Sequence, residues 1–317
     1  MVLTREEEYR KIVEAYGDAG GNTGLLGDKQ VANMVVHENR VLNANEVEGI
    51  SLKSESTERG VALKLTVEEG RKIEHPVHLC FGMLPQEGLQ EIDLKMNVQD
   101  GSEVNIIAHC VFPNAIDITH KMDADIKIGN NAVFSYSETH YHGDHGGINV
   151  IPKARVEVGE NSVYRNTFAL IKGQVGKLDF DYETLCGRKS NTELVAKVYG
   201  KARDSIRIAE KVHLNGEEAK SLIKSRLVLR DKAWAEVVGE TYGNAPLARG
   251  HVDCNEIVDG DEAVARAIPI VSVSNRQAKV THEAAIGSID KKQMQTLMAR
   301  GLSEEEAINV IVRGMLA

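Results

Sequence analysis

The pattern that decides the fold is the sequence Ala-Arg-Val-Glu-Val-Gly-Glu-Asn-Ser at residues 154–162. Apolar and charged residues alternate in its first half, which is typical of a β-strand that buries one face. A polar turn that begins with glycine ends the strand. Related turns begin at Gly129, Gly187 and Gly216, so the unit of strand and turn recurs about every 29 residues. A period of this length indicates supersecondary units stacked into a solenoid.

Short alternating segments continue from about residue 60 to residue 280. We therefore expect a mainly β protein whose core, residues 60–289, is a parallel β-helix. A helical and irregular region, 1–59, and a C-terminal helical hairpin, 290–317, are expected to flank this core. The aromatic content of 4% fits a narrow interior filled by stacked Val, Ile, Leu and Ala rather than large rings. A β-sandwich is the alternative, because strand patterning alone does not distinguish the two folds.

Helical periodicity is confined to the two ends of the chain. Thr4 and Glu7 have the spacing of a capping box and predict a short amphipathic helix after them. Asp290 and Ser303 begin the two helices expected in the hairpin, and Gly301 separates them. Both helices carry faces rich in Met and Ile. We expect one face to pack on the core and the other to bind a partner.

Composition excludes several classes of function. With 317 residues, 42% apolar and 27% charged, the chain is expected to be globular. A net charge of −9 argues against a surface for nucleic acid or anionic membrane. The chain has no early apolar run and no apolar span of about 20 residues, so we expect neither export nor a membrane anchor, and a cytoplasmic location.

The C-terminal third contains four segments that match a known family: His-Val-Asp-Cys-Asn-Glu-Ile-Val at 251–258, Ala-Ile-Pro at 267–269, Thr-His-Glu-Ala at 281–284 and Arg-Gly-Leu-Ser-Glu-Glu-Glu-Ala at 300–307. In these segments, their order and their spacing, the chain resembles the SufB and SufD proteins of the SUF iron–sulfur cluster assembly system, and most of all the single SufBD-type proteins of archaea. The resemblance implies a right-handed β-helical core and a role as a non-catalytic scaffold.

The resemblance also implies that Cys254, His282 and Glu283 bind the cluster. Thiolate, imidazole and carboxylate are ligand types that hold iron. Mixed ligation should hold an iron–sulfur cluster less tightly than four cysteines would, so that the cluster is transient and passes to apoprotein acceptors. Glu283 matches SufB, whereas Thr281 stands where SufB carries a further acidic residue. The alternative for Cys254 and His282 is a buried thiol and a structural histidine.

Two partners are expected. The resemblance implies that a SufC-type ABC ATPase docks on residues 290–317 and supplies energy, since the chain has no Gly-x-x-x-x-Gly-Lys-Ser/Thr phosphate loop of its own. The open strand edges of a solenoid need a cover, and a second copy of the chain, giving a homodimer, would provide one.

A competing motif lies in the middle of the chain. His140, His142, Asp144 and His145 match the His-x-His-x-Asp-His signature of the metallo-β-lactamase superfamily, whose two metal ions activate water for hydrolysis. That motif should follow a buried strand and begin a helix, but the residues on both sides of it alternate as strands do, and Pro152 opposes a helix. A metal-dependent hydrolase is therefore the alternative function. An ancillary metal site or a hydrogen-bonded histidine ladder are further readings of the motif.

The four cysteines are spaced far apart and none forms a CxxC pair, which indicates reduced thiols rather than a disulfide framework. Cys80 and Cys110 lie in apolar runs and are expected to be buried and inert. Cys186 precedes a turn and is expected to be more accessible. Cys254 alone falls in a family segment.

Overall fold

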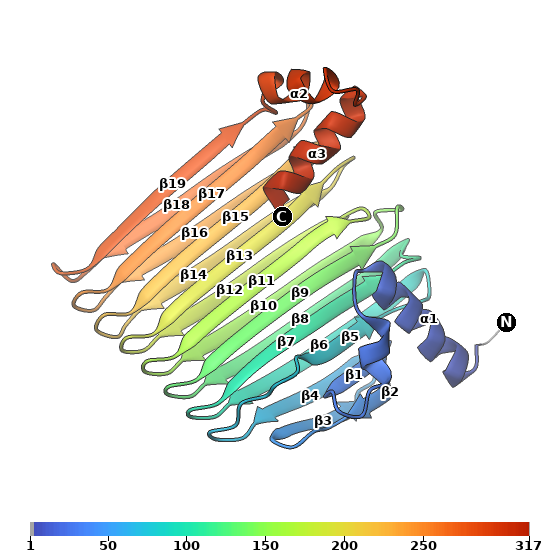
Figure 1. Cartoon of the computed structure of the whole chain (residues 1–317), viewed down its shortest axis with the longest axis vertical. Coiled ribbons are helices and arrows are strands. Elements are labelled where there is room, and N and C mark those ends of the chain that lie inside the picture. The colour runs from blue at the N-terminus through green and yellow to red at the C-terminus, as the bar shows by residue number, and fades with distance from the viewer. Residues whose placement is uncertain (1–2, 317) are drawn as a thin grey trace.

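The computed structural model describes residues 3–316, in which nineteen β-strands form two sheets of a parallel β-solenoid (Figure 1). Successive strands alternate between the sheets from β4 onward, and each strand pairs with the strand one coil before and one coil after it. The predicted solenoid is thus confirmed. The strands of sheet A are β1 (Asn33–His37), β2 (Arg40–Asn45), β5 (Val77–Gly82), β7 (Glu103–Phe112), β9 (Val133–His142), β11 (Val163–Lys172), β13 (Asn191–Gly200), β15 (Lys220–Arg230), β17 (Arg249–Asp259) and β19 (Lys279–Gly287). The strands of sheet B are β3 (Ile50–Ser56), β4 (Gly60–Val67), β6 (Glu87–Val98), β8 (Asp117–Ile128), β10 (Ile148–Val158), β12 (Lys177–Cys186), β14 (Ser205–Leu214), β16 (Trp234–Gly243) and β18 (Val264–Val273).

The length of one coil agrees with the repeat seen in the sequence. Val163 lies beside Val133 on one neighbouring strand and beside Asn191 on the other, so the coils are offset by 30 and 28 residues. Residues directly opposite one another on neighbouring parallel strands point to the same face of the sheet.

The recurring turns stack on one another through their backbones. Asn131, Asn161 and Lys189 hold the third position of successive turns, and each has a positive φ of 54° to 55°. The amide of Asn131 donates to the carbonyl of Glu160 at 2.8 Å, and equivalent bonds link the turns that follow. Glycine at the first position is required by close approach: a Cβ on Gly159 would lie 2.5 Å from the Gly129 carbonyl oxygen. The turn sequence therefore fixes the stacking.

Every second residue of each strand points into the solenoid, and the interior is mainly Val, Ile, Leu, Ala and Met. All five phenylalanines also lie there, and Phe134 stacks on Tyr164 with ring centroids 5.7 Å apart. The expectation of an interior without large rings was therefore wrong for the middle coils. The low aromatic content of the chain therefore means that few aromatic side chains lie on the surface.

The two ends of the solenoid differ. At the N-terminal end, antiparallel pairing of β1 with β2 and of β3 with β4 begins the sheets. The strands thus extend into the region 1–59, which was expected to be helical or irregular. At the C-terminal end, β18 and β19 are the last strands of their sheets and are parallel to their neighbours. This C-terminal end, formed by β18 and β19, is called the open end below.

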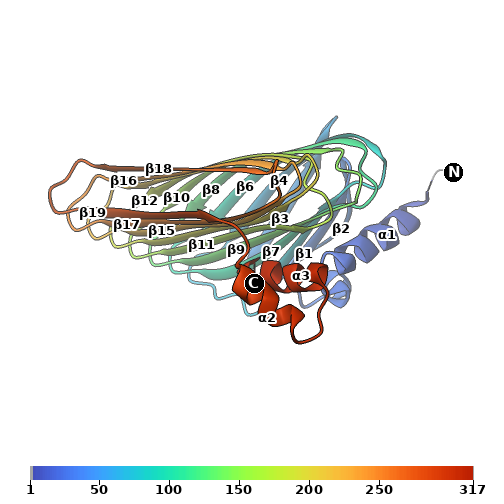
Figure 2. The same ribbon diagram turned by 90° about the horizontal axis from the view of Figure 1, so that it is seen from above.

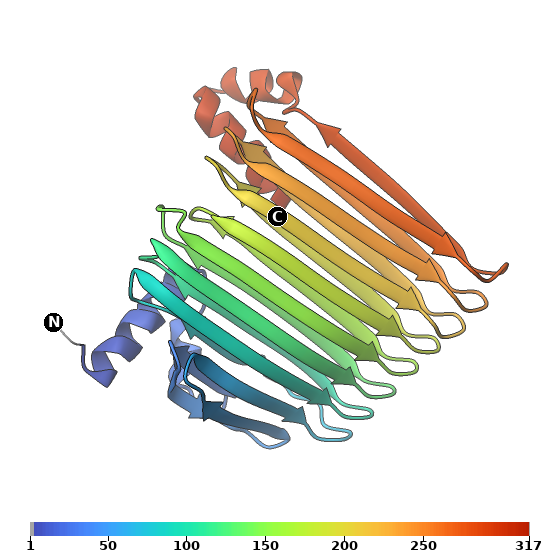
Figure 3. The same ribbon diagram turned by 180° about the vertical axis from the view of Figure 1, so that it is seen from behind.

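Within residues 3–316, three α-helices lie near the ends of the chain: α1 (Arg5–Asp18), α2 (Lys291–Met298) and α3 (Glu304–Leu316), with a 3-10 helix at Thr23–Gly27. The predicted capping box of Thr4 and Glu7 is present at the start of α1. In Figure 2, α1 and α3 lie on the same side of the molecule, next to sheet A. The view from behind in Figure 3 shows the strands of sheet B with the helices beyond them. No helix within residues 3–316 has the length and apolarity needed to cross a bilayer.

The C-terminal hairpin packs through one face, as expected. Ile308, Val312 and Leu316 of α3 are buried against Val228 of β15. Val310 of α3 and Met298 of α2 remain 46% and 40% exposed. The hairpin therefore has a face that holds it on sheet A and a second face that is free in the single chain.

Candidate functional site

Cys254 and His282 lie on neighbouring strands and on the same face of sheet A. Cys254 is on β17, where burial alternates and Cys254 is 1% exposed in the interior. His282 of β19 pairs with Val252, which is also interior, so His282 and Cys254 are diagonal neighbours across the two strands. His282 is exposed because no coil covers β19. The structure thus brings together two of the three residues expected to bind the cluster.

Glu283 points away from them. It pairs with Asp253, and both residues lie on the outer face of sheet A, because successive side chains of a strand alternate in direction. Asp253 is held there by the guanidinium of Arg226. The side-chain hydrogen bond from Arg226 lowers the pKa of Asp253. Within one chain, Glu283 is therefore separated from Cys254 and His282 by the thickness of the sheet.

The thiol of Cys254 lies at the last closed layer of the interior. Its neighbour toward the open end is Ala284, whose side chain is a single methyl group. Burial raises the pKa of Cys254, the neighbouring Ser225 hydroxyl opposes this rise, and the charge of Glu256 adds to it. The thiol therefore favours its protonated form until a metal ion displaces the proton.

Two buried carboxyl groups share the interior with Cys254. Glu210 and Glu256 are 1% and 0% exposed, and none of their carboxylate oxygens has a hydrogen-bond partner among residues 3–316. Burial raises the pKa of Glu210 to about 8 and that of Glu256 to about 7. Near neutral pH, Glu210 is therefore largely protonated and Glu256 is about half protonated. Neither was singled out from the sequence.

The open end exposes apolar side chains that closed coils would bury. Val271 and Val273 of β18 pair with interior positions of β16 and are 38% and 47% exposed. Ile286 of β19 pairs with the interior Glu256 and is 49% exposed. Together with His282, these side chains form an apolar surface with one imidazole beside the covered thiol of Cys254.

The four residues of the hydrolase motif do not meet. His140 and His142 are at the end of β9, point into the solenoid and are each 1% exposed. Asp144 and His145 lie in the exposed turn that follows, and the side chain of Asp144 is 90% exposed and lies 4.0 Å from the ammonium of Lys201. The segment after this turn is strand β10 rather than a helix. The arrangement required for a two-metal hydrolase is therefore absent from these four residues.

A different set of groups surrounds His140. Its Nε2 atom lies 2.6 Å from a carboxylate oxygen of Glu138, and the Tyr136 hydroxyl donates to the other oxygen at 2.9 Å. Cys110 of β7 pairs with His140 across the sheet. One potential ligand atom from each of Cys110, Glu138 and His140 lies within 4.8 Å of the others. These three residues are called the interior triad below.

The other thiols are structural. Cys80 is buried beneath α1, in a cluster with Ile12 and Tyr16. Cys186 is 1% exposed and its sulfur lies 3.3 Å from the hydroxyl of Thr192. The expectation that Cys186 is accessible was therefore wrong, because its side chain is directed into the solenoid before the turn begins.

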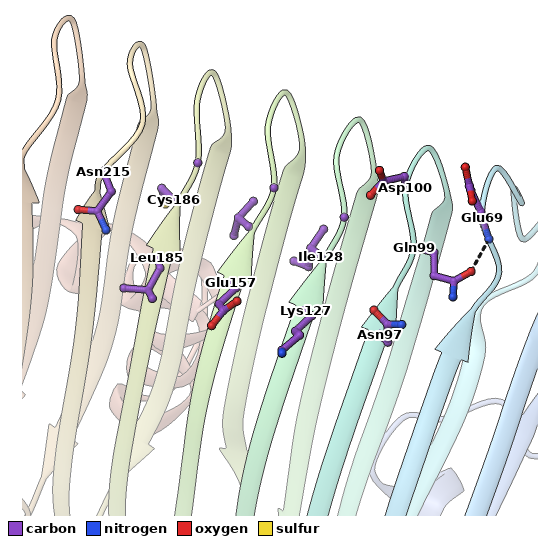
Figure 4. Close-up of a pocket in the computed structure, with 14 residues that line it drawn as sticks. Glu69, Asn97, Gln99, Asp100, Lys127, Ile128, Glu157, Leu185, Cys186 and Asn215 are labelled. Carbon is purple, nitrogen blue, oxygen red and sulfur yellow. Dashed lines mark hydrogen bonds between the residues drawn. The ribbon is translucent and has the colours of Figure 1, made fainter.

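Two surface grooves accompany these features. One, of about 770 Å³, runs across the stacked turns and is bordered by Glu69, Lys127 and Asn215 (Figure 4). Gln99 accepts a hydrogen bond from the Glu69 amide in this groove, and no residue expected to bind the cluster lines it. The second, of about 760 Å³, lies between β17 and the C-terminal hairpin and includes Val310 and Ile311.

Comparison with known proteins places this arrangement in a family. Residues 86–315 match the family model described as "SUF system FeS cluster assembly, SufBD core domain". The chain belongs to the SufBD family. The match runs from β6 through most of α3 and so includes Cys254, His282 and the C-terminal hairpin.

Two SufBD family relatives match almost the whole chain. An iron-sulfur cluster assembly SufBD family protein of Methanocaldococcus jannaschii is 39% identical over 99% of this chain and 99% of its own length. A family member of Pyrococcus horikoshii is 36% identical over 99% of this chain and 95% of its own length. A bacterial family member of Staphylococcus saprophyticus is 25% identical over 79% of this chain and 54% of its own length.

Sequence reasoning overlooked the interior triad of this SufBD family member. The triad is formed by residues far apart in the sequence, and the histidine motif directed attention to Asp144 and His145 instead. The signal was present, because Cys110 and His140 are separated by 30 residues, the length of one coil. Two residues one coil apart are neighbours on the same face of a solenoid.

Proposed function

We propose that the protein is a non-catalytic scaffold of SUF-type iron–sulfur cluster assembly that binds a nascent cluster at the open end. The family supports a role in cluster assembly. The observation that carries the proposal is the placement of Cys254 and His282 as neighbours on the inner face of the last strands. A thiolate and an imidazole there supply two ligands of the type that iron accepts. The cluster is cargo, to be passed to apoprotein acceptors.

A second copy of the chain would complete the site. One chain directs Glu283 away from Cys254 and His282, so the three ligand groups do not converge within it. Two open ends that meet would bury the exposed Val271, Val273 and Ile286 and pair the edge strands. The cluster would then lie between the two copies, with Glu283 at the rim of the interface, where it can exchange with other ligands.

The cluster site is tested by anaerobic reconstitution with iron and sulfide. Cys254→Ser is expected to abolish the iron–sulfur absorbance and the bound sulfide, whereas Cys186→Ser, which removes another buried thiol, is expected to retain both. His282→Ala is expected to lower cluster yield. Equal reconstitution of the Cys254→Ser variant and the unmodified protein would refute the assignment of this thiolate.

The C-terminal hairpin is proposed to dock a SufC-type ABC ATPase. Its free face carries Val310 and Met298, and the adjacent groove of about 760 Å³ can receive apolar side chains. Val310→Asp is expected to prevent co-purification with the ATPase while the β core remains folded. Ile308→Asp is the contrasting variant, because Ile308 packs on sheet A and its replacement should loosen the hairpin itself. Unchanged co-purification of the Val310→Asp variant would refute this docking surface.

The buried His140 and the exposed Asp144 do not converge, which argues against a metal-dependent hydrolase.

A further inference from the structure

We propose that the interior triad, Cys110, Glu138 and His140, is a binding site for one divalent metal ion of the zinc or ferrous type, separate from Cys254. The three residues are buried and supply one thiolate, one carboxylate and one imidazole. This set of sulfur, oxygen and nitrogen ligands is the kind that binds Zn²⁺ and Fe²⁺. The proposal does not depend on the proposed function, because the triad lies in the middle coils, far along the solenoid from β17 and β19.

The fold places the three side chains so that they converge. Cys110 of β7 and His140 of β9 are paired neighbours, and both point inward. Glu138 is two residues before His140 and therefore has the same direction. Their ligand atoms lie within 4.8 Å of one another. Bonds of about 2.0 to 2.3 Å to a tetrahedral ion would bring these atoms about 3.5 Å apart, which needs only small side-chain rotations.

Hydrogen bonds around the triad orient His140 for metal binding. The Nδ1 atom of His142 lies 3.1 Å from the carbonyl oxygen of Gln174, which can only accept, so Nδ1 carries the proton. The Nε2 atom of the neutral His142 ring then accepts from Nδ1 of His140 at 3.3 Å. This leaves Nε2 of His140 facing the carboxyl group of Glu138 at 2.6 Å. A histidine that binds a metal ion through one ring nitrogen typically has its other ring nitrogen held by a hydrogen bond, as Nδ1 of His140 is here.

The exchange of protons for metal conserves charge. In the metal-free triad, the Cys110 thiol carries one proton, and a second proton lies between Glu138 and Nε2 of His140. Binding of a divalent ion releases both protons and forms bonds to the thiolate, the carboxylate and the neutral imidazole. The site has no net charge before or after the exchange. This neutrality matters because an uncompensated charge in an apolar interior is strongly unfavourable.

A third imidazole, beside those of His140 and His142, gives the interior a potential ligand atom that forms no hydrogen bond within the described residues. His120 of β8 faces the triad from sheet B, with its ring centroid 5.9 Å from that of His140. It is 1% exposed, and its Nδ1 atom has no hydrogen-bond partner in the part of the chain that the structure describes. A buried polar atom without a partner costs about 1 to 3 kcal/mol. Three protein ligands leave the fourth position of a tetrahedral ion free. A water molecule bound at this position would lie near His120.

Cobalt binding tests the site. The full chain carrying Cys254→Ser, which removes the thiol of the open end, is unfolded in urea and refolded anaerobically with Co²⁺. We expect one bound ion per chain with thiolate-to-cobalt charge-transfer absorption. Cys110→Ser in this background should remove that absorption, whereas Cys186→Ser should retain it. Tyr136→Phe, which removes the hydrogen bond to Glu138, should weaken binding about tenfold.

Two further measurements keep the result independent of how the variants fold. Asp144→Asn and His145→Ala, both in the exposed turn, should leave cobalt binding unchanged. X-ray absorption of the Zn²⁺-loaded Cys254→Ser protein should show one sulfur neighbour at about 2.3 Å together with nitrogen or oxygen neighbours. The proposal is overturned if no sulfur neighbour is found, if the charge-transfer absorption survives Cys110→Ser, or if Asp144→Asn abolishes binding.

Discussion

Replacement of Glu210 by Gln should remove a large part of the pH dependence of stability. Burial raises the pKa of Glu210 from 4.5 to about 8. The folded protein therefore favours the protonated carboxyl group, and the unfolded chain releases the proton at lower pH. The stabilising effect is complete below pH 4.5, declines as the pH rises and is lost above about pH 8.

The expected magnitude follows from the shift of the pKa. Each pH unit above 4.5 lowers the free energy of unfolding by about 1.4 kcal/mol, so the loss is about 3 kcal/mol at pH 7 and about 5 kcal/mol above pH 8. Glu210→Gln keeps the size of the side chain but cannot ionise. Its free energy of unfolding should therefore equal that of the unmodified protein near pH 4.5 and exceed it by several kcal/mol at pH 9.

Urea denaturation from pH 4.5 to pH 9 measures this difference. Glu217→Gln is the matched control, because Glu217 is in an exposed turn and the same substitution there should leave the pH dependence unchanged. Glu256 contributes a similar but smaller effect in both proteins, so the difference between them isolates Glu210. Parallel curves for the unmodified protein and the Glu210→Gln variant would refute the account of a protonated interior carboxyl group.

Three further predictions concern the turns, the core and the open end. Gly159→Ala should lower the melting temperature by several degrees, because its Cβ would lie 2.5 Å from a carbonyl oxygen, whereas Gly27→Ala, with open space around it, should have little effect in the same calorimetric measurement. Phe168→Ala should cost about 3 to 5 kcal/mol in urea unfolding, because Phe168 is 1% exposed; a cost below about 1 kcal/mol would show that the core closes over the cavity. Val273→Asp at the open end should convert the proposed dimer into monomers in analytical ultracentrifugation, and an unchanged mass would exclude this end as the dimer interface.

The periodic part of the fold could be predicted because the same physical requirement recurs in every coil. Each turn has a residue with positive φ, which is Asn at 131 and 161 but Lys at 189, and a glycine where two turns approach closely. The recurring glycine is therefore the signal that marks the turns in the sequence. The strands within 33–56 lack this signal. β1 is buried on both faces and does not alternate, so its sequence resembles a short apolar run rather than a solenoid strand.

The candidate site was only partly predicted from the sequence, although the coil length of 30 residues shows which residues lie side by side on neighbouring strands. Cys254 pairs with Ala284, two residues after His282, so Cys254 and His282 share a face, whereas Glu283 directly follows His282 and must point to the other side of the sheet. The same argument places Cys110 beside His140 and explains why His140 and Asp144 separate: β9 ends at His142, and the alternation of directions ends with it. A sequence motif groups residues that are close in the chain, but the ends of the strands decide which of their side chains lie close in space.

The most direct test of the central claim is to ask whether His282 binds the cluster. Pulsed electron paramagnetic resonance of the reduced, reconstituted protein should detect the nitrogen of an imidazole ligand. His282→Ala should remove this nitrogen coupling. His251→Ala should retain it, because His251 lies on the outer face of β17. There its Nδ1 atom forms a hydrogen bond of 2.9 Å with the hydroxyl of Thr281. A nitrogen coupling that persists in His282→Ala, or one that is lost in His251→Ala, would contradict a cluster held on the inner face of the open end.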